Sequence, residues 1–329
     1  MAKNTKIEWA THTLNPWIGC TKISPGCDGC YAEALMDKRM HKVQWGAGNP
    51  RDRTSAANWN MPLKWNANHD AFFAEHGYRQ RVFCASLADV FDNAVDPQWL
   101  SDLFELIRRT PNLDWLLLTK RIGNWKSRMQ AVHDHLSVRR PPTPKPRSVT
   151  DEESDAMNWV DAWLRNDVDP IPANVWLGAT IVNQEEANRD IPKLLQVPAA
   201  KRFLSIEPLL GDVTIFDLDG PIDVPDGMKS PIDWVIVGGE SGPGARPMHP
   251  DWARSLRDQC EAAGVPFLFK QWGEWLPGSQ ADESDGVQMI SLGRCQDGHR
   301  WHNGTTSWKL GKKIAGRLLD GRTWDGAPS

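Results

Sequence analysis

The amino-acid sequence predicts an α/β protein built as a partial or near-complete (β/α) barrel of parallel strands. Each of its short apolar runs is continuous and rich in β-branched or aromatic residues, as expected of a strand buried on both faces. Helical patterns lie between several of these runs, and this repetition indicates parallel βαβ units. The runs are residues 81–91, 114–121, 175–181, 202–210, 233–241 and 265–273, and the clearest helical patterns are residues 97–110, 184–197 and 249–264.

With "TLNPWIGC" (13–20) as a first strand, the chain has about seven βα units, close to a full ring. An open doubly wound sheet is the alternative, and the number of strands does not decide between them. Residues 137–170 interrupt the pattern as a Pro-rich basic linker followed by an amphipathic helix, which indicates a helical insertion. We therefore expect a barrel domain over residues 1–277 and a C-terminal covering segment over residues 278–329, made of a polar surface loop (278–288) and a basic helix (308–322).

Composition is that of an ordinary soluble globular protein. The 329 residues are 40% hydrophobic and 24% charged, with a net charge of −4. No overall positive field indicates nucleic acid, so a nucleic-acid substrate needs a local groove. The sequence shows no signal peptide and no apolar run near the roughly 20 residues of a membrane span, so we expect a cytoplasmic protein. Cysteines stay reduced in that compartment and can act as metal ligands.

Three cysteines stand within eleven residues, in the stretch "GCTKISPGCDGCYAE" (19–33). Cys20, Cys27 and Cys30 are one ligand short of a closed structural metal site, which leaves a coordination position open. Zinc could take a fourth ligand from His12, His41 or Asp28, and a [4Fe–4S] cluster could leave one iron open. The spacing favours the cluster, because zinc sites usually use two separated ligand pairs. The isolated cysteines Cys84, Cys260 and Cys295 are expected to be buried.

Polar side chains follow five of the predicted strands directly. The carboxyl ends of parallel strands share one edge of the sheet, where ligands bind in this architecture. We therefore expect an active-site rim formed by Ser86, Asp89, Lys120, Arg121, Asn183, Glu207, Glu240 and Ser241.

A three-cysteine loop after the first strand of a partial barrel resembles the radical S-adenosylmethionine (radical SAM) superfamily. The usual spacing there is C-x3-C-x2-C, whereas this chain has C-x6-C-x2-C and continues from "CDGCYAEAL" into a predicted helix. The expanded spacing, together with "TKR", "SIEPLLG", "VIVGGESGPGARP", "KQWGEW" and "GKKIAGRLLDGR", resembles a phage and prophage family of three-cysteine proteins. This second resemblance covers nearly the whole chain.

The resemblance implies a cofactor site. Cys20, Cys27 and Cys30 would ligate three irons of a [4Fe–4S] cluster, and the fourth iron would bind SAM. An electron donor such as a flavodoxin or ferredoxin would reduce the cluster, giving a 5′-deoxyadenosyl radical. The remaining contacts to SAM would come from Ser86 and Asp89 for the amino group, Lys120 or Arg121 for the carboxylate, and Asn183 and Glu207 for the ribose. The late "GGE" (238–240) is not assigned the role of the superfamily's glycine-rich motif.

Two later motifs are candidates for substrate binding. In "GGESGPGARPMHP", backbone N–H groups near Glu240, Ser241 and Arg246 could hold a phosphate or carboxylate, and a tight Gly-Pro turn is the alternative. In "FKQWGEW" (269–275), Gln271 could read a base edge while Trp272 stacks on the base. The alternative for Trp272 is an aromatic plug. The basic C-terminal helix could dock on the barrel or contact a phosphate backbone.

The resemblance implies an isomerase of phage DNA hypermodification that converts N-linked glycyl-thymidine into a C-linked form. DNA or a nucleotide would then be the substrate. A repair enzyme resembling spore photoproduct lyase is an alternative that needs a hydrogen-donating cysteine, and only Cys84 lies near the rim. From other classes, the chain could be a zinc-stabilised nucleic-acid-binding protein without catalysis, or a zinc hydrolase using Glu33 as base.

Overall fold

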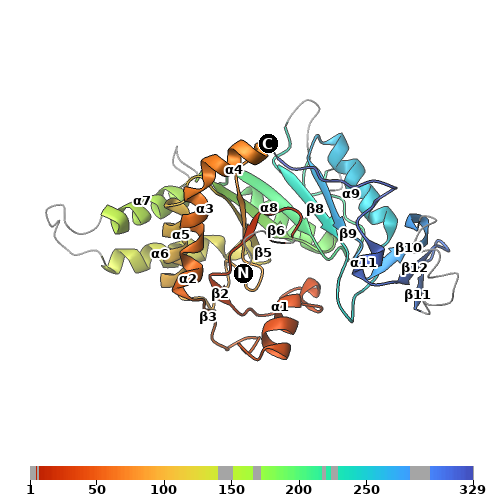
Figure 1. Ribbon diagram of the computed structural model, residues 1–329, viewed down its shortest axis with the longest axis horizontal. Coiled ribbons are helices and arrows are strands. Elements are labelled where there is room, and N and C mark those ends of the chain that lie inside the picture. Colours follow the sequence, from red (N-terminus) through yellow and green to blue (C-terminus); the bar gives the residue numbers. More distant parts are fainter. Residues whose placement is uncertain are drawn as a thin grey trace. The chain divides into compact units, whose positions relative to one another are not determined.

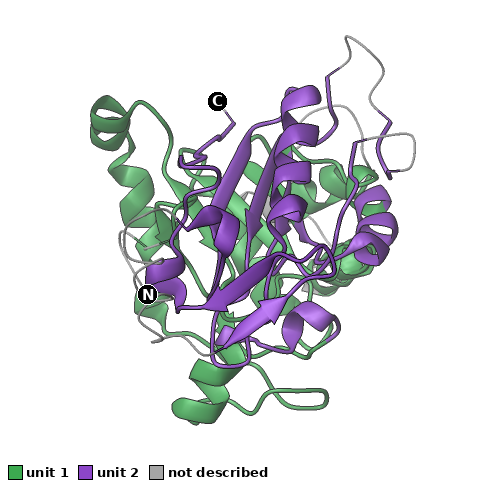
Figure 2. Cartoon of the chain, turned by 90° about the vertical axis from the view of Figure 1, so that its right-hand side faces the viewer, with its two compact units in different colours: residues 1–22, 32–178, 193–201 green, residues 23–31, 179–192, 202–329 purple. Residues whose placement is uncertain are grey.

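The computed structural model describes residues 5, 7–139, 151–165, 172–216, 220–223, 229–281 and 297–328. The chain forms two compact units, coloured green and purple in Figure 2. The first unit contains residues 1–22, 32–178 and 193–201, and the second contains residues 23–31, 179–192 and 202–329. The three-cysteine stretch is therefore divided, with Cys20 in the first unit and Cys27 and Cys30 in the second.

The first unit carries parallel strands, with register pairs His12↔Val82 and Arg81↔Asp114. The expected single strand over residues 13–20 is wrong, because this stretch holds parts of two strands in different sheets. Pro16, which has no backbone N–H to donate, lies between them. The strands of this part are β1 (His12–Thr13), β4 (Arg81–Cys84) and β5 (Asp114–Thr119) in the main sheet, and the antiparallel pair β2 (Trp17–Ile18) and β3 (Asp52–Arg53).

Helices α5, α6 and α7 of the first unit lie side by side (Figure 1). Trp163 of α7 is buried against the rings of Phe104, Trp125 and Trp159, with centroids 5.2–5.8 Å apart. This packing confirms an amphipathic helix in the predicted insertion, whose residues 140–150 and 166–170 lie outside the described part of the chain. The helices are α1 (Tyr31–Glu33), a π-helical segment (Ala34–Arg39), α2 (Ala56–Trp59), α3 (Met61–Ala67), α4 (His69–His76), α5 (Pro97–Arg108), α6 (Trp125–Arg139) and α7 (Asp151–Arg165).

The second unit is also built from parallel strands and helices. Three of its strands are paired in parallel, with register pairs Phe203↔Trp234 and Val235↔Phe267, and most of their residues are buried. The elements that lie wholly or mostly in this unit are α8 (Gln184–Leu195), β7 (Lys201–Ile206), β8 (Trp234–Gly238), α9 (Pro250–Ala262) and β9 (Phe267–Gln271). Helix α9 begins with a proline and is followed by a glycine with a left-handed φ of +64°, as expected from the sequence between residues 249 and 264.

The strand order confirms the predicted fold class. The main sheet has the order β1-β4-β5-β6-β7-β8-β9, in which β6 spans Val175–Thr180. All of the described registers in this sheet are parallel. Strands β1 and β9 stand at the two ends of the order, so the α/β fold is a partial barrel of seven strands.

The C-terminal segment differs from the expected covering helix. Strands β10 (Trp275–Pro277), β12 (Thr306–Lys309) and β11 (Gly298–Arg300) form an antiparallel sheet in that order. The predicted basic helix over residues 308–322 is wrong, since only the single turn α11 (Lys312–Ala315) is helical there. Gly311 and Gly316, with φ of +88° and +64°, flank this turn in backbone conformations that end a helix. Residues 282–288 of the expected polar loop lie outside the described residues.

Within the described residues, no helix combines the length and the apolar character that crossing a bilayer requires.

Gly239 and Trp272 meet where β8 and β9 end. A Cβ at Gly239 would lie 2.0 Å from the carbonyl oxygen of Trp272, and the Gly239 N–H donates to Gln271 O at 2.8 Å. The two strand ends therefore approach closely only because residue 239 has no side chain.

We expect Gly239→Ala to lower the free energy of unfolding by about 1–3 kcal/mol or more, because the backbone of Trp272 must move away. Gly244→Ala is the control, since a Cβ there meets no atom within 4 Å. Denaturant unfolding of both variants measures the difference. Equal stability of the two variants would contradict the close approach.

Candidate functional site

Cys20 and Arg121 form the first cluster, within the first unit. The Arg121 Nη1 donates to Cys20 Sγ at 3.3 Å, and its Nη2 donates to the carbonyl oxygen of Thr21 at 2.5 Å. Burial raises the pKa of Cys20 to about 12, the charge of Asp89 adds to this rise, and Arg121 opposes it. Cys20, a predicted ligand, thus has its own cationic hydrogen-bond donor in this unit, an arrangement that is common around metal sites.

Asp89 orients Arg121 and is itself fully bonded. One carboxylate oxygen accepts from Thr119 Oγ1 at 2.7 Å, and the other accepts from the Lys120 N–H at 2.8 Å. The Arg121 guanidinium forms an ion pair with it at 3.3 Å, and both side chains are buried. The predicted role of Asp89 at the SAM amino group is therefore not supported, because both oxygens already serve the protein.

Ser86 is held by a residue that the sequence analysis did not single out. Its Oγ is 3.0 Å from Asn15 Nδ2, and the Leu87 N–H donates to Asn15 Oδ1 at 2.7 Å. Asn15 is buried and fixes the loop that follows β4. The buried ion pair between Arg51 and Asp92, at 2.8 Å, was also missed. Asp92 directly follows the predicted strand 81–91, so its position was a signal that could have been used, whereas only tertiary contacts reveal the roles of Asn15 and Arg51.

The second cluster lies in the second unit, around the C-x2-C part of the cysteine stretch. A 3₁₀ turn over Pro25–Cys27 is capped by Ser24, and Cys27 is buried. Arg246 donates to the Pro25 carbonyl oxygen at 2.8 Å and to Asp28 Oδ2 at 3.2 Å. The same unit therefore contains the turn that carries Cys27 and the arginine that holds its backbone.

Glu240 is the anion that Arg246 binds. Both carboxylate oxygens accept from the guanidinium, at 2.7 and 2.8 Å, and the backbone N–H of Arg246 also donates to Glu240. The sequence predicted a site for a phosphate or carboxylate here. The structure fills it with the carboxylate of Glu240, so the predicted substrate-binding role of Glu240 and Arg246 is not supported.

Glu207, Gln271 and Ser241 come together at the ends of β7, β8 and β9. Both oxygens of Glu207 lie 2.8 Å from Lys270 Nζ, and one lies 3.1 Å from Gln271 Nε2. Ser241 Oγ is 3.4 Å from Gln271 Oε1. Gly238 leaves room for Glu207, whose carboxyl group would be 3.3 Å from an added Cβ. Glu207 and Ser241, two residues of the predicted rim, thus both contact Gln271, and Glu207 is already paired with Lys270; the rim as a binding site stays a prediction.

Trp272 does not lie at a binding surface. It is 1% exposed, packs edge-on against Phe269 at 4.8 Å, and donates from Nε1 to Leu318 O at 2.8 Å. The proposed stacking of Trp272 on a base is therefore wrong, and the alternative of an aromatic plug fits its burial.

Asn183 caps helix α8. Its Oδ1 accepts from the Glu186 N–H at 2.9 Å, while Glu186 Oε2 accepts from the Val182 N–H at 3.1 Å. This reciprocal arrangement resembles a capping box, and the spacing Asn-x-x-Glu at 183–186 was a sequence signal for it. The side-chain oxygen of Asn183 is used by the helix, and its predicted contact with a ribose stays a prediction.

The remaining cysteines are packing residues where the structure describes them. Cys84 and Cys260 are fully buried, and burial raises the pKa of both thiols. Cys295 lies outside the described residues. The burial of Cys84 does not suit a hydrogen donor to a substrate.

Two of the candidate zinc ligands, His12 and Asp28, and the candidate base Glu33 have partners. His12 is buried with Nε2 2.8 Å from Gln80 Oε1, and it stacks on Trp65. Glu33 forms an ion pair with Lys22 at 2.7 Å. Among the described residues, no group of three or more His, Cys, Asp or Glu side chains is arranged to hold a metal ion. The ligand set Cys20, Cys27 and Cys30 therefore stays a prediction.

The chemistry of the donors nonetheless fits an iron–sulfur cluster. Cys20, Cys27 and Cys30 form no disulfides, and thiolates are the ligands that such clusters use. The sulfur of Cys20 receives a guanidinium hydrogen bond, which stabilises the negative charge that cluster ligation needs.

Comparisons with known proteins show the family. A family model described as "Protein of unknown function (DUF5131)" matches residues 4–328, so the chain belongs to that family. A comparison with curated proteins found no match.

Solved structures of spore photoproduct lyase are similar at a low level. A double mutant with bound AdoMet and dinucleoside spore photoproduct aligns with a TM-score of 0.37 and 10% identity. Two single mutants align with TM-scores of 0.36 and 0.37, at 9% and 10% identity. Each alignment covers 93% of this chain and 70% of that chain. These scores are too low to assign chemistry to this chain.

We expect Asn183→Ala to lower the free energy of unfolding by about 1 kcal/mol, because the first turn of α8 loses its cap. Asn183→Ser, which keeps a capping oxygen, should stay close to the wild type. Urea unfolding of the two variants checks this, and equal losses in both would argue against capping.

Proposed function

We propose that this protein is a radical SAM enzyme. The observation that carries the proposal is the reduced C-x6-C-x2-C stretch, whose first cysteine is hydrogen-bonded by Arg121. A thiolate triad with one coordination position left over is the ligand set of a cluster that also binds a small molecule. Cys20, Cys27 and Cys30 would hold the cluster. When reduced, the cluster with bound SAM supplies a 5′-deoxyadenosyl radical.

The residues of the chain would position and shield this chemistry. Arg121 donates to the sulfur of Cys20, and hydrogen bonds to ligand sulfurs influence the reduction potential of such clusters. Lys120 is half-buried after β5, and its side chain is the cation that we assign to the carboxylate of SAM. Ser86 and the partly exposed pair of Glu207 and Lys270 are the polar groups that we assign to the cofactor and substrate.

For the substrate we propose a modified thymidine of phage DNA, as the resemblance to three-cysteine phage proteins implies. The reaction would convert N-linked glycyl-thymidine into a C-linked isomer. The bond from the thymine methyl carbon to nitrogen is exchanged for a bond to the glycyl carbon, and one hydrogen moves from that carbon to the nitrogen. The atoms balance without a further reactant, so substrate and product have the same mass. A flavodoxin or ferredoxin would supply the activating electron.

The alternatives differ in what they require. A repair enzyme resembling spore photoproduct lyase would need an accessible hydrogen-donating cysteine, whereas Cys84 is fully buried. A zinc-stabilised nucleic-acid-binding protein or a zinc hydrolase would contain zinc rather than iron and sulfide after anaerobic purification. Metal analysis therefore separates these classes.

We expect anaerobically reconstituted protein to release 5′-deoxyadenosine when it is given SAM and dithionite. Cys27→Ala should abolish the release, because one cluster ligand is lost, and Cys260→Ala is the control at a cysteine outside the motif. Chromatography with mass detection measures the product. A wild type that holds an intact cluster and releases none would exclude radical SAM activity.

For the isomerisation, we expect digested phage DNA carrying N-linked glycyl-thymidine to yield a nucleoside of unchanged mass and altered retention after treatment. The fragmentation spectrum should show a carbon–carbon link at the former methyl group. Release of 5′-deoxyadenosine with no new nucleoside would retain the enzyme class and reject this substrate.

A further inference from the structure

Arg246 connects the backbone of the cysteine turn to a buried carboxylate. It reaches the Pro25 carbonyl oxygen and Asp28 on one side, and both oxygens of Glu240 on the other. All of these residues belong to the second unit. The Pro25 carbonyl oxygen also accepts from the Asp28 N–H at 3.2 Å, so the guanidinium bonds the same atom that closes the turn.

These contacts differ in strength. The contact with Glu240 uses two guanidinium N–H groups and both oxygens of a carboxylate that is only 5% exposed, and such bidentate pairs are strong. The contact with Asp28 is weak, because that carboxylate is 66% exposed and 3.2 Å away. The anchoring of the turn therefore depends on the bond to the Pro25 carbonyl oxygen, with Glu240 fixing the arginine.

Gly29 packs against the same carboxylate. A Cβ at this position would lie 2.8 Å from Glu240 Oε1. Glu240 cannot swing away without breaking its contacts with Arg246. The residue between Asp28 and Cys30 must therefore be a glycine for the Glu240–Arg246 pair to keep its geometry.

We propose that the Glu240–Arg246 pair is a positioning device for the C-x2-C arm, holding the backbone on which Cys27 and Cys30 stand in its ligand-presenting conformation. The assignment of the two cysteines as cluster ligands rests on the proposed function. The positioning itself is a property of the protein without cofactor. Glu240 and Arg246 act through the turn and touch no substrate.

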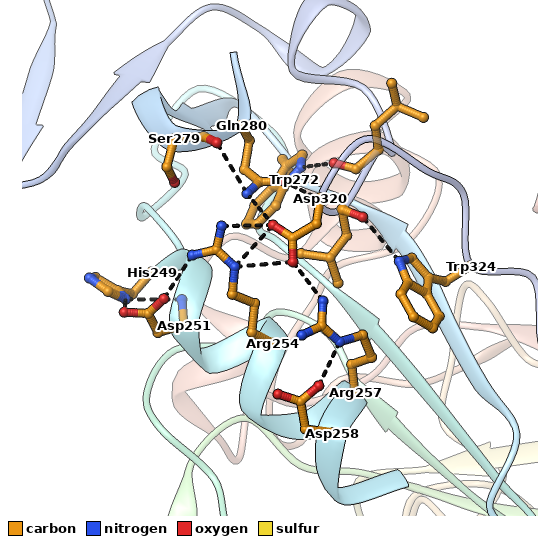
Figure 3. A network of polar contacts seen from close by, with 12 residues as sticks. His249, Asp251, Arg254, Arg257, Asp258, Trp272, Ser279, Gln280, Asp320 and Trp324 are labelled. Atoms are coloured by element: carbon orange, nitrogen blue, oxygen red, sulfur yellow. Dashed lines mark hydrogen bonds and ion pairs between the residues drawn. The ribbon is translucent and has the colours of Figure 1, made fainter. Parts of the chain in front are cut away.

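Arg254 offers a matched control in the same unit. This arginine of α9 donates to Asp251 at 2.8 Å and to Asp320 at 2.7 Å (Figure 3). Hydrogen bonds from Arg254 hold the pKa of Asp320 well below its usual range. Arg254→Ala thus removes a similarly bonded guanidinium without a contact to the cysteine turn.

The first experiment uses the full-length protein without cluster. In Arg246→Ala, hydrogen exchange of a peptide covering residues 24–31 should become roughly 10-fold faster, because a charge-assisted bond to the turn is lost. Arg254→Ala and Asp28→Ala should leave that peptide near the wild-type rate. Gly29→Ala should behave like Arg246→Ala, and it serves as the test variant if Arg246→Ala fails to fold.

The second experiment uses reconstituted protein and an iron chelator. The cluster absorbance should bleach about 10-fold faster in Arg246→Ala than in Arg254→Ala, as expected when a residue supporting the ligands is removed. Exchange and bleaching that match the Arg254→Ala control would overturn the positioning role. A wild type that takes up no cluster would instead overturn the proposed function, and the exchange measurement would still decide the role of the pair.

Discussion

A carboxylate that leaves water at the end of a buried strand needs a cation, and this requirement organises both units. Desolvation of an unpaired carboxylate is costly, so the chain supplies a partner for each one. Asp89 after β4 pairs with Arg121 after β5, within the first unit. In the second unit, Glu207 after β7 pairs with Lys270 in β9, and Glu240 after β8 pairs with Arg246.

These ion pairs show that the polar residues at the strand ends bind other residues of the protein. A charged residue after a parallel strand suggests ligand binding. The carboxylate oxygens of Asp89 and Glu240, however, accept hydrogen bonds from other groups of the protein. Their arginines then contact the cysteine stretch, at the sulfur of Cys20 and at the carbonyl oxygen of Pro25. The chain thus uses its strand-end carboxylates to place cations beside the residues that are the candidate cluster ligands. Side chains that bond to ligand residues rather than to the metal commonly tune and orient those ligands in metal sites.

Patterns that depend on neighbours in the sequence were accurate. Each of the six continuous apolar runs overlaps a strand of the main sheet, and each of the three helical patterns contains a helix. The main sheet has seven strands, as many as the predicted βα units, although its first strand is His12–Thr13 and not the predicted 13–20. Two further local signals in the sequence also predict helix boundaries. Asn-x-x-Glu at residues 183–186 indicated a helix cap, and glycines at 311 and 316 argued against a continuous C-terminal helix.

The sequence alone determined the α/β class, the alternation of strands and helices from β4 to β9, and a three-cysteine stretch suited to metal chemistry. Only the tertiary structure decided which polar groups are already bonded: that Glu240 fills the anion site at Arg246, that Trp272 is buried, and that Gly29 must lack a side chain. The physical reason is the separation along the sequence of the residues that interact. Periodicity and capping are set by residues within a few positions of one another, whereas the partners of Pro25 and Gly29 stand more than two hundred residues away along the chain.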